Sequence, residues 1–232
     1  MKFFAVLLIV LATWVHLWAQ TKRCDVGVQA PPVGFWVWPA GSQIKVYVVE
    51  SDFQPGEVSH LLTPLASWNA VSELTGSRVK FEYAGTVMSA PHCENCLTIE
   101  RGAVFDKRQR HLTELRAYSA RGDRILSWAS IVIDPALTNP SALTDAVAHE
   151  LGHNFGLLDC YSCKTRATVM NQFGPVNSPN NLPGPTACDV AQVKLAYKQL
   201  TLQTSRTAPA KTLPDEGEEP VDDDTPIVIP KP

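Results

Sequence analysis

Apolar side chains recur with two different periods along the middle of the chain, and each period predicts a different kind of element. Apolar residues three or four positions apart predict a helix from about Gly56 to Leu74. Alternation rich in β-branched residues predicts a strand over Gln43–Glu50. Further strands are expected at Arg78–Ala84, Leu97–Val104, Leu115–Ala120 and Ile125–Ile133. Because most strands come first and helices later, we expect an α+β fold rather than regular βαβ alternation.

Two more helices are expected in the second half of the chain. Asn139 is a typical N-cap, and Pro140 suits the first helical position. This helix is expected to reach about Phe155 and to end at Gly156, the residue best able to adopt a left-handed turn. A last helix is expected over 186–200, after a loop rich in proline, glycine and asparagine.

The two ends of the chain differ from the middle. Residues 1–19 combine Lys2, a short apolar run and the small residue Ala19, which predicts a secretory signal peptide cleaved after Ala19. A membrane anchor is the alternative, but the apolar run is short for a span of about 20 residues. Residues 205–232 contain six prolines and seven acidic side chains, so we expect a disordered tail. The folded domain is therefore expected at 20–204.

Composition and charge exclude several classes of protein. The 232 residues are 45% hydrophobic and 19% charged, unlike a wholly disordered, collagen-like or multi-span membrane protein. The net charge of −3 gives no reason to expect nucleic acid as a partner. The tail, with three basic and seven acidic residues, accounts for all of this acidity.

All six cysteines lie within the expected domain, at positions 24, 93, 96, 160, 163 and 188. An even number in an exported chain predicts three disulfides and leaves their pairing open. Two pairs of these cysteines, 93/96 and 160/163, have the C-x-x-C spacing, which also occurs in zinc ribbons. The two C-x-x-C segments lie too far apart in the sequence for a ribbon, so disulfides are favoured.

The helix that begins at Pro140 carries the segment His149-Glu150-Leu151-Gly152-His153. Histidines four positions apart lie on the same face of a helix, so both imidazoles can reach one metal ion. Glu150 is rotated by about 100° from His149, which places its carboxylate beside an open metal position. There it can take a proton from an attacking water and later give it to a leaving amine.

A third metal ligand is expected shortly after this motif, because catalytic zinc sites use three protein ligands and one open position. A sharp turn at Gly156 can bring the carboxylate of Asp159 back toward the histidines. The alternative is that Asp159 caps the end of the helix and a water completes the metal shell.

This part of the sequence resembles the metzincin metallopeptidases, whose pattern is H-E-x-x-H-x-x-G-x-x-H followed by a methionine-containing turn. The matching residues are His149, Glu150, His153 and Gly156, with Met170 as the expected turn methionine. Asp159 stands where most of the superfamily has histidine, as in the snapalysin-type bacterial endopeptidases. The resemblance is specific over about residues 140–200. It implies a metzincin-like zincin domain: a mixed twisted sheet, an active-site helix, a Met-turn and a C-terminal helix.

The resemblance implies further roles around the site. The strand at Trp128–Ile133 is expected to lie along the cleft and to bind peptide by strand pairing. The loop Gln172–Pro185 is expected to wall a substrate pocket, with Phe173 as a candidate lining residue. Tyr161 is a candidate donor to the developing oxyanion. Ordinary packing is the alternative for each.

The segment Lys22-Arg23-Cys24-Asp25 resembles the cysteine segment that blocks zinc in latent matrix metalloproteinases. The even number of cysteines favours a disulfide at Cys24 instead, with Cys188 as the candidate partner.

These observations predict a secreted, monomeric zinc endopeptidase that acts on peptide or protein substrates. Zn²⁺ is expected on His149, His153 and Asp159, with Glu150 as general base and acid. No nucleic-acid partner and no stable membrane insertion after signal cleavage are expected. The alternative is a secreted disulfide-bonded binding module that keeps the metal without peptidase activity. A zinc amidase acting on cell-wall peptides would differ only in its substrate.

Overall fold

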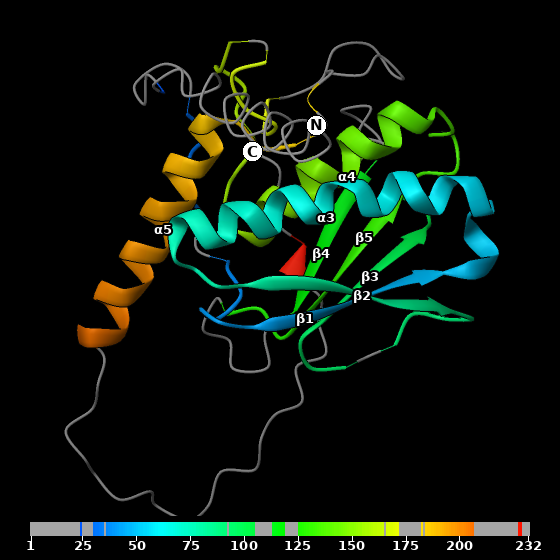
Figure 1. The fold of residues 1–232 in the computed structure, drawn as a ribbon, viewed down its shortest axis with the longest axis horizontal. Helices are drawn as coiled ribbons and strands as arrows, with labels where there is room; N and C mark the ends of the chain where they lie inside the picture. The colour runs from blue at the N-terminus through cyan, green and yellow to red at the C-terminus, as the bar shows by residue number, and fades with distance from the viewer. Residues whose placement is uncertain are drawn as a thin grey trace, which may run out of the picture.

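The protein forms a six-stranded sheet with helices packed against it (Figure 1). The computed structural model describes residues 24, 30–34, 36–91, 93–104, 113–118, 125–164, 166–171, 182, 184–206 and 227–228. The strands are β1 (Gln43–Val49), β2 (Lys80–Val87), β3 (Cys96–Arg101), β4 (Thr113–Tyr118), β5 (Trp128–Ile133) and β6 (Ile227–Val228). The helices are α3 (Pro55–Thr75), α4 (Pro140–Asn154) and α5 (Ala187–Arg206), with a short 3-10 turn at Glu50–Asp52.

The sheet has the order β2-β1-β3-β5-β4-β6 and mixed strand directions. The first four strands in this order are parallel to one another, whereas β4 runs antiparallel to β5 and β6 runs antiparallel to β4. The expected α+β class is confirmed.

The strand expected to bind peptide along the cleft is inside the sheet. β5 pairs with β3 on one side and with β4 on the other along its whole length. It therefore has no open edge for an added peptide strand, and the expectation for Trp128–Ile133 is wrong. β4 follows β5 in the order of the sheet and lies one strand closer to the edge that ends with β6. On the side away from β5, β4 pairs with β6.

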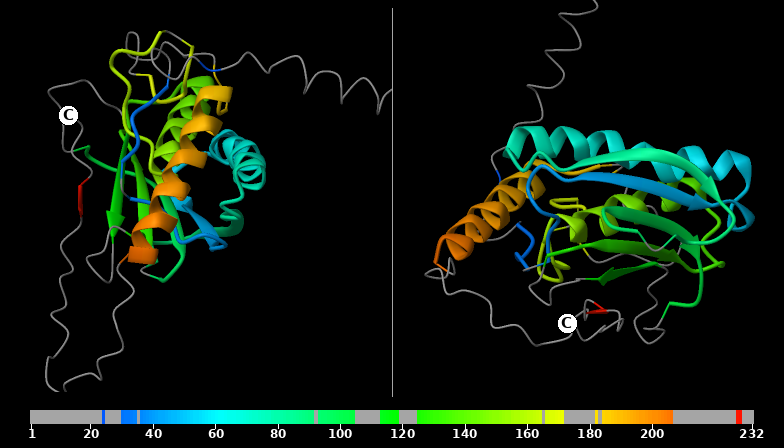
Figure 2. Two further views of the ribbon diagram at one scale, coloured as in Figure 1. Left: turned by 90° about the vertical axis from the view of Figure 1, so that its left-hand side faces the viewer. Right: turned by 90° about the horizontal axis from the view of Figure 1, so that it is seen from below.

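Helices α3 and α4 pack against each other on one face of the sheet (Figure 2). α3 begins with a reciprocal capping box between Gln54 and Glu57 and ends at Gly76, whose φ of 76° is left-handed. α4 begins as expected, because the Asn139 side chain accepts a hydrogen bond from the backbone of Ala142. All residues of α4 from Ala142 to Asn154 are buried, so this helix lies in the middle of the molecule.

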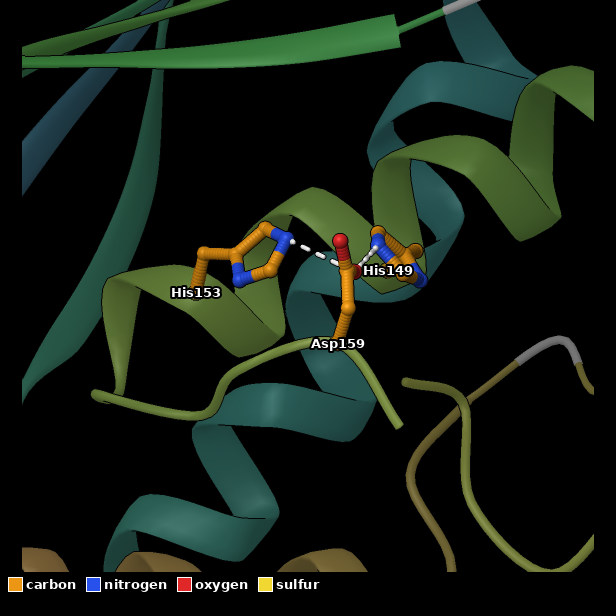
Figure 3. Close-up of side chains that lie close together, drawn as sticks. All are labelled: His149, His153 and Asp159. Carbon is orange, nitrogen blue, oxygen red and sulfur yellow. Dashed lines mark ion pairs between the residues drawn. The ribbon is translucent and has the colours of Figure 1, made fainter. Parts of the chain in front are cut away.

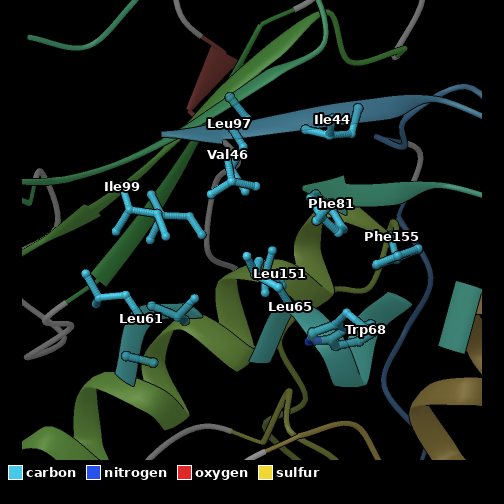
Figure 4. Close-up of a cluster of buried hydrophobic side chains, with 14 of the residues drawn as sticks. Ile44, Val46, Leu61, Leu65, Trp68, Phe81, Leu97, Ile99, Leu151 and Phe155 are labelled. Atoms are coloured by element: carbon cyan, nitrogen blue, oxygen red, sulfur yellow. The ribbon is translucent and has the colours of Figure 1, made fainter. Parts of the chain in front are cut away.

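The core fills the space between the sheet and these helices (Figure 4). The rings of Trp68 on α3 and Phe155 stack with centroids 5.0 Å apart, and Phe81 of β2 meets Phe155 edge-on at 5.7 Å. The indole N–H of Trp68 also donates to the backbone oxygen of Ala148, at 2.9 Å. Burial of these rings and this hydrogen bond fix α4 relative to α3.

All six cysteines are paired in three disulfides: Cys24–Cys188, Cys93–Cys96 and Cys160–Cys163. The expected Cys24–Cys188 pair is confirmed, and the zinc-ribbon alternative is excluded. Because Cys24 is disulfide-bonded, it offers no thiolate that would block a metal ion.

The two ends of the chain fall largely outside the described residues. The expected signal peptide at 1–19 lies there completely. α5 continues two residues past the expected domain boundary at 204, and Ile227–Val228, in the segment expected to be disordered, forms β6. Within the described ranges, no helix has both the length and the hydropathy needed to span a membrane.

Candidate metal centre

The last turns of α4 carry two buried histidines on the same face (Figure 3). The side chains of His149 and His153 are 1% and 3% exposed, and their ring centroids lie 4.9 Å apart with nearly perpendicular planes. The four-residue spacing on the helix thus brings both imidazoles to one place, as the sequence predicted.

A left-handed turn brings the chain back toward these histidines. Gly156 has φ +80°, and a Cβ atom there would come within 2.7 Å of Val37 Cγ1. The backbone N–H of Leu157 donates to the oxygen of Gly152 at 3.2 Å, which closes the end of the helix. Only glycine fits this turn easily, and the turn is what directs Asp159 to the site.

The Asp159 carboxylate lies between the two imidazoles (Figure 3). Its Oδ1 atom is 2.9 Å from His149 Nε2 and 3.4 Å from His153 Nε2. The ligand atoms of a tetrahedral zinc site with bonds of about 2.0–2.1 Å would lie about 3.3 Å apart. One nitrogen from each histidine and one carboxylate oxygen therefore form a group that can hold a metal ion.

Backbone carbonyls determine which ring nitrogens face this group. His149 Nδ1 is 2.9 Å from the backbone oxygen of Val169, and His153 Nδ1 is 2.7 Å from that of Leu157. A carbonyl oxygen only accepts, so both Nδ1 atoms carry hydrogen. In neutral imidazoles the Nε2 lone pairs then point at the oxygen of Asp159, an arrangement that a cation between them stabilises.

The electrostatics of the cluster favour an ionised carboxylate. Burial acts to raise the pKa of Asp159, but without a metal ion the hydrogen bonds and positive charges of His149 and His153 outweigh it and hold that pKa well below its usual range. Two imidazole nitrogens and a carboxylate oxygen are a donor set suited to a divalent metal such as zinc.

Glu150 lies next to this cluster without being part of it. Its side chain is fully buried, and its Oε2 atom is 3.9 Å from His153 Nε2. The Asn154 side chain bonds the backbone oxygen of Glu150 at 3.0 Å and accepts from the Trp38 indole at 2.8 Å. These bonds fix this turn of α4 and with it the position of the carboxylate.

The expected methionine turn packs directly under α4. In Thr168–Asn171 the backbone N–H of the last residue donates to the oxygen of the first at 3.4 Å. Met170 is completely buried, and its backbone oxygen accepts from the N–H of Cys160 at 2.8 Å. A Cβ atom on Gly152 would overlap the Met170 sulfur and come within 3.3 Å of Trp68, so the glycine inside the motif makes room for the methionine.

Sequence reasoning missed Asp189, which anchors this turn from below. It forms a capping box with Thr186 at the start of α5 and also accepts from the Thr168 hydroxyl and the Val169 N–H. The backbone oxygen of Val169 accepts from His149 Nδ1, so Asp189 is linked to the site through a single residue, Val169. The Thr186-x-x-Asp189 spacing was the sequence signal that could have identified it.

The two remaining candidates differ in what the structure describes. Tyr161 is 46% exposed, and its hydroxyl donates to Asp159 Oδ2 over a long distance of 3.5 Å. It therefore lies at the edge of the cluster. Phe173 lies outside the described residues, together with most of the loop expected to form a pocket wall.

The fold and the cluster define a class: an α+β protein with a buried two-histidine, one-aspartate group on and after its central helix. No family model matches the chain, and no curated protein matches it.

Proposed function

We propose that the protein is a secreted zinc-dependent endopeptidase of metzincin type, similar to the snapalysin branch. The observation that carries the proposal is the convergence of His149, His153 and Asp159 on one point, with the Glu150 carboxylate beside them. A site with a purely structural metal needs the three ligands but has no use for a buried glutamate at its open side.

A zinc ion held by these three residues would polarise the scissile carbonyl and make the attacking water more acidic. Glu150 takes the proton of that water and then delivers it to the leaving amine. His149 and His153 stay oriented through this transfer, because their Nδ1 atoms are bonded to backbone oxygens.

The aspartate at the third position changes the charge of the site. One carboxylate in place of a neutral imidazole makes the ligand set more negative by one charge. The attacking water is then less acidic than with three histidines, which places more of the proton transfer on Glu150. Tyr161, with its hydroxyl beside Asp159, is the candidate donor to the developing oxyanion.

Export from the cell is supported by the three disulfides, since such bonds persist in oxidising compartments. A peptide or protein is the proposed substrate, and the chain is proposed to act as a monomer.

Replacement of Glu150 by alanine tests the proposal. We expect Glu150→Ala to reduce hydrolysis of casein and of a fluorogenic peptide by about 10²–10⁴-fold, because the general base is removed. Zinc should stay near one ion per chain by elemental analysis, since no ligand is changed. The matched control is Glu73→Ala, on the exposed side of α3, which should keep both activity and zinc.

Two results would contradict this assignment. Undiminished hydrolysis in Glu150→Ala would remove Glu150 from the mechanism, and loss of zinc would make it a ligand. A wild-type protein that holds zinc but never cleaves casein or gelatin, with or without a chelator, would instead favour the binding module without activity.

A further inference from the structure

The C-terminal tail adds a strand to the edge of the sheet. Ile227 pairs with Ala117 and Val228 pairs with Arg116, so β6 lies antiparallel along the outer side of β4. On its inner side, β4 pairs with β5 over all six of its residues. Without β6, the outer backbone groups of β4 would be open to another extended chain.

The strand that receives the tail also contacts the helix of the candidate metal centre. β4 contacts α4, the helix that carries His149 and His153. β5, in contrast, has partners on both sides and no open edge. Among the described strands, β4 is thus the one in contact with this helix whose edge an extended peptide can join.

The sequence of the tail suits a short and replaceable strand. Ile227, Val228 and Ile229 form a β-branched run in a segment that is otherwise acidic and rich in proline. Pro226 and Pro230 flank this run, and proline cannot donate to a strand ladder. The pairing therefore stops after a few residues, and a longer peptide gains more backbone hydrogen bonds on the same edge.

We propose that Ile227–Val228 is an intramolecular occupant of the β4 edge, which an incoming extended peptide must displace. The tail then acts as a built-in competitor of peptide binding. The pairing itself stands independently, whereas its effect on substrate rests on the proposed peptidase function. One edge holds one strand at a time, so tail and substrate exclude each other.

Hydrogen exchange of the full chain tests the pairing without any need for activity. Ile227→Pro/Val228→Pro removes two backbone donors, and we expect the amides of 113–118 to exchange several-fold faster by mass spectrometry. The matched control, Thr212→Pro/Leu213→Pro, changes two neutral tail residues outside β6 and should leave this exchange as in wild type. Unchanged exchange in the β6 variant would overturn the proposal.

A labelled peptide tests occupancy directly. Fluorescein-labelled peptide 221–232 should bind the Ile227→Pro/Val228→Pro variant at least about tenfold more tightly than wild type or the control, as measured by anisotropy, because only the variant has a free edge. Equal binding to all three proteins would overturn the proposal.

Kinetics then separate the tail from the proposed function. We expect the β6 variant to have a several-fold lower KM for an extended peptide substrate with kcat unchanged, and the added tail peptide to inhibit it competitively. An unchanged KM in an active enzyme would overturn the competition. If exchange and anisotropy respond but no protein hydrolyses peptide, the occupant assignment stands and the proposed function fails.

Discussion

Two buried aspartates are linked to the turn at Thr168–Asn171, one directly and one through its neighbour in the chain, and they differ in what surrounds them. Asp159 faces two imidazoles, and the residue after it bonds to the turn through a backbone N–H. Asp189 faces only neutral donors, two hydroxyls and two backbone amides. Both are almost inaccessible, at 4% and 0% exposure.

The difference shows that burial alone does not decide the state of a carboxyl group. Near His149 and His153 the pKa of Asp159 is held low, whereas burial raises the pKa of Asp189 and its hydrogen bonds offset this only in part. An ionised carboxylate next to two imidazole nitrogens can hold a cation. Neutral donors make a rigid anchor instead, and the two together form and support one site.

Isosteric replacement of each aspartate gives the largest expected contrast. Asp159→Asn should reduce zinc affinity by more than about 100-fold, because a charged ligand is lost. Asp189→Asn should reduce it by less than about tenfold while lowering the free energy of unfolding by about 1–3 kcal/mol, because an acceptor of several hydrogen bonds is altered. Elemental analysis after dialysis measures the loss of zinc. Urea unfolding measures the change in the free energy of unfolding.

The comparison fails if the two variants behave alike. Equal loss of zinc would mean that Asp189 positions the metal as strongly as a ligand does. Full zinc content in Asp159→Asn would leave the metal on the two histidines, with water as the third ligand.

Removal of each C-x-x-C disulfide tests, with a smaller expected effect on zinc affinity, how the chain around Asp159 is held in place. Cys160 follows Asp159 directly, so Cys160→Ser/Cys163→Ser should loosen that ligand and weaken zinc binding by about tenfold. Cys93→Ser/Cys96→Ser opens a loop of the same size at the start of β3 and should leave zinc affinity unchanged.

Competition with a chromophoric chelator measures zinc affinity in both cysteine variants. The same loss in both would attribute the effect to general destabilisation. No loss in either would show that the turn at Gly156 places Asp159 without help from the disulfide.

The smallest expected effect concerns pH. Burial raises the pKa of Asp189 in the folded protein above its unfolded value of about 3.9. The contribution of Asp189 to the free energy of unfolding is therefore complete below the unfolded pKa, and it is lost as the pH rises through the folded pKa. The stability advantage of wild type over Asp189→Asn should therefore shrink between pH 4 and pH 7. Thermal unfolding at several pH values checks this, and an advantage that grows with pH would contradict the raised pKa.

Local signals in the sequence were enough to find most elements and the metal cluster. Asn139-Pro140 and Gly156 marked the ends of α4 within a residue or two, and the spacing of His149 and His153 determined their common face. Such features depend on neighbours within one or two helical turns, which a sequence displays directly.

Features that depend on distant partners were not predictable in the same way. Strands were expected near β4 and β5, but a local sequence pattern carries no information about which strand lies at the edge. The pairing of β6 with β4 and the contact of Asp189 with Thr168 join segments far apart in the chain. To predict the β6–β4 pairing, one has to know the order of the strands in the sheet. To predict the contact of Asp189 with Thr168, one has to know that α5 packs against the methionine turn.

The bond between Cys24 and Cys188 has a consequence for the integrity of the molecule. It joins residues separated by 164 positions, so the sheet from β1 to β5, α3, α4 and the metal cluster belong to one covalent ring. A single peptide-bond cut inside a ring opens it without releasing a fragment. Proteolysis there would add one water to the mass and leave one band on a non-reducing gel, and only reduction would separate the pieces.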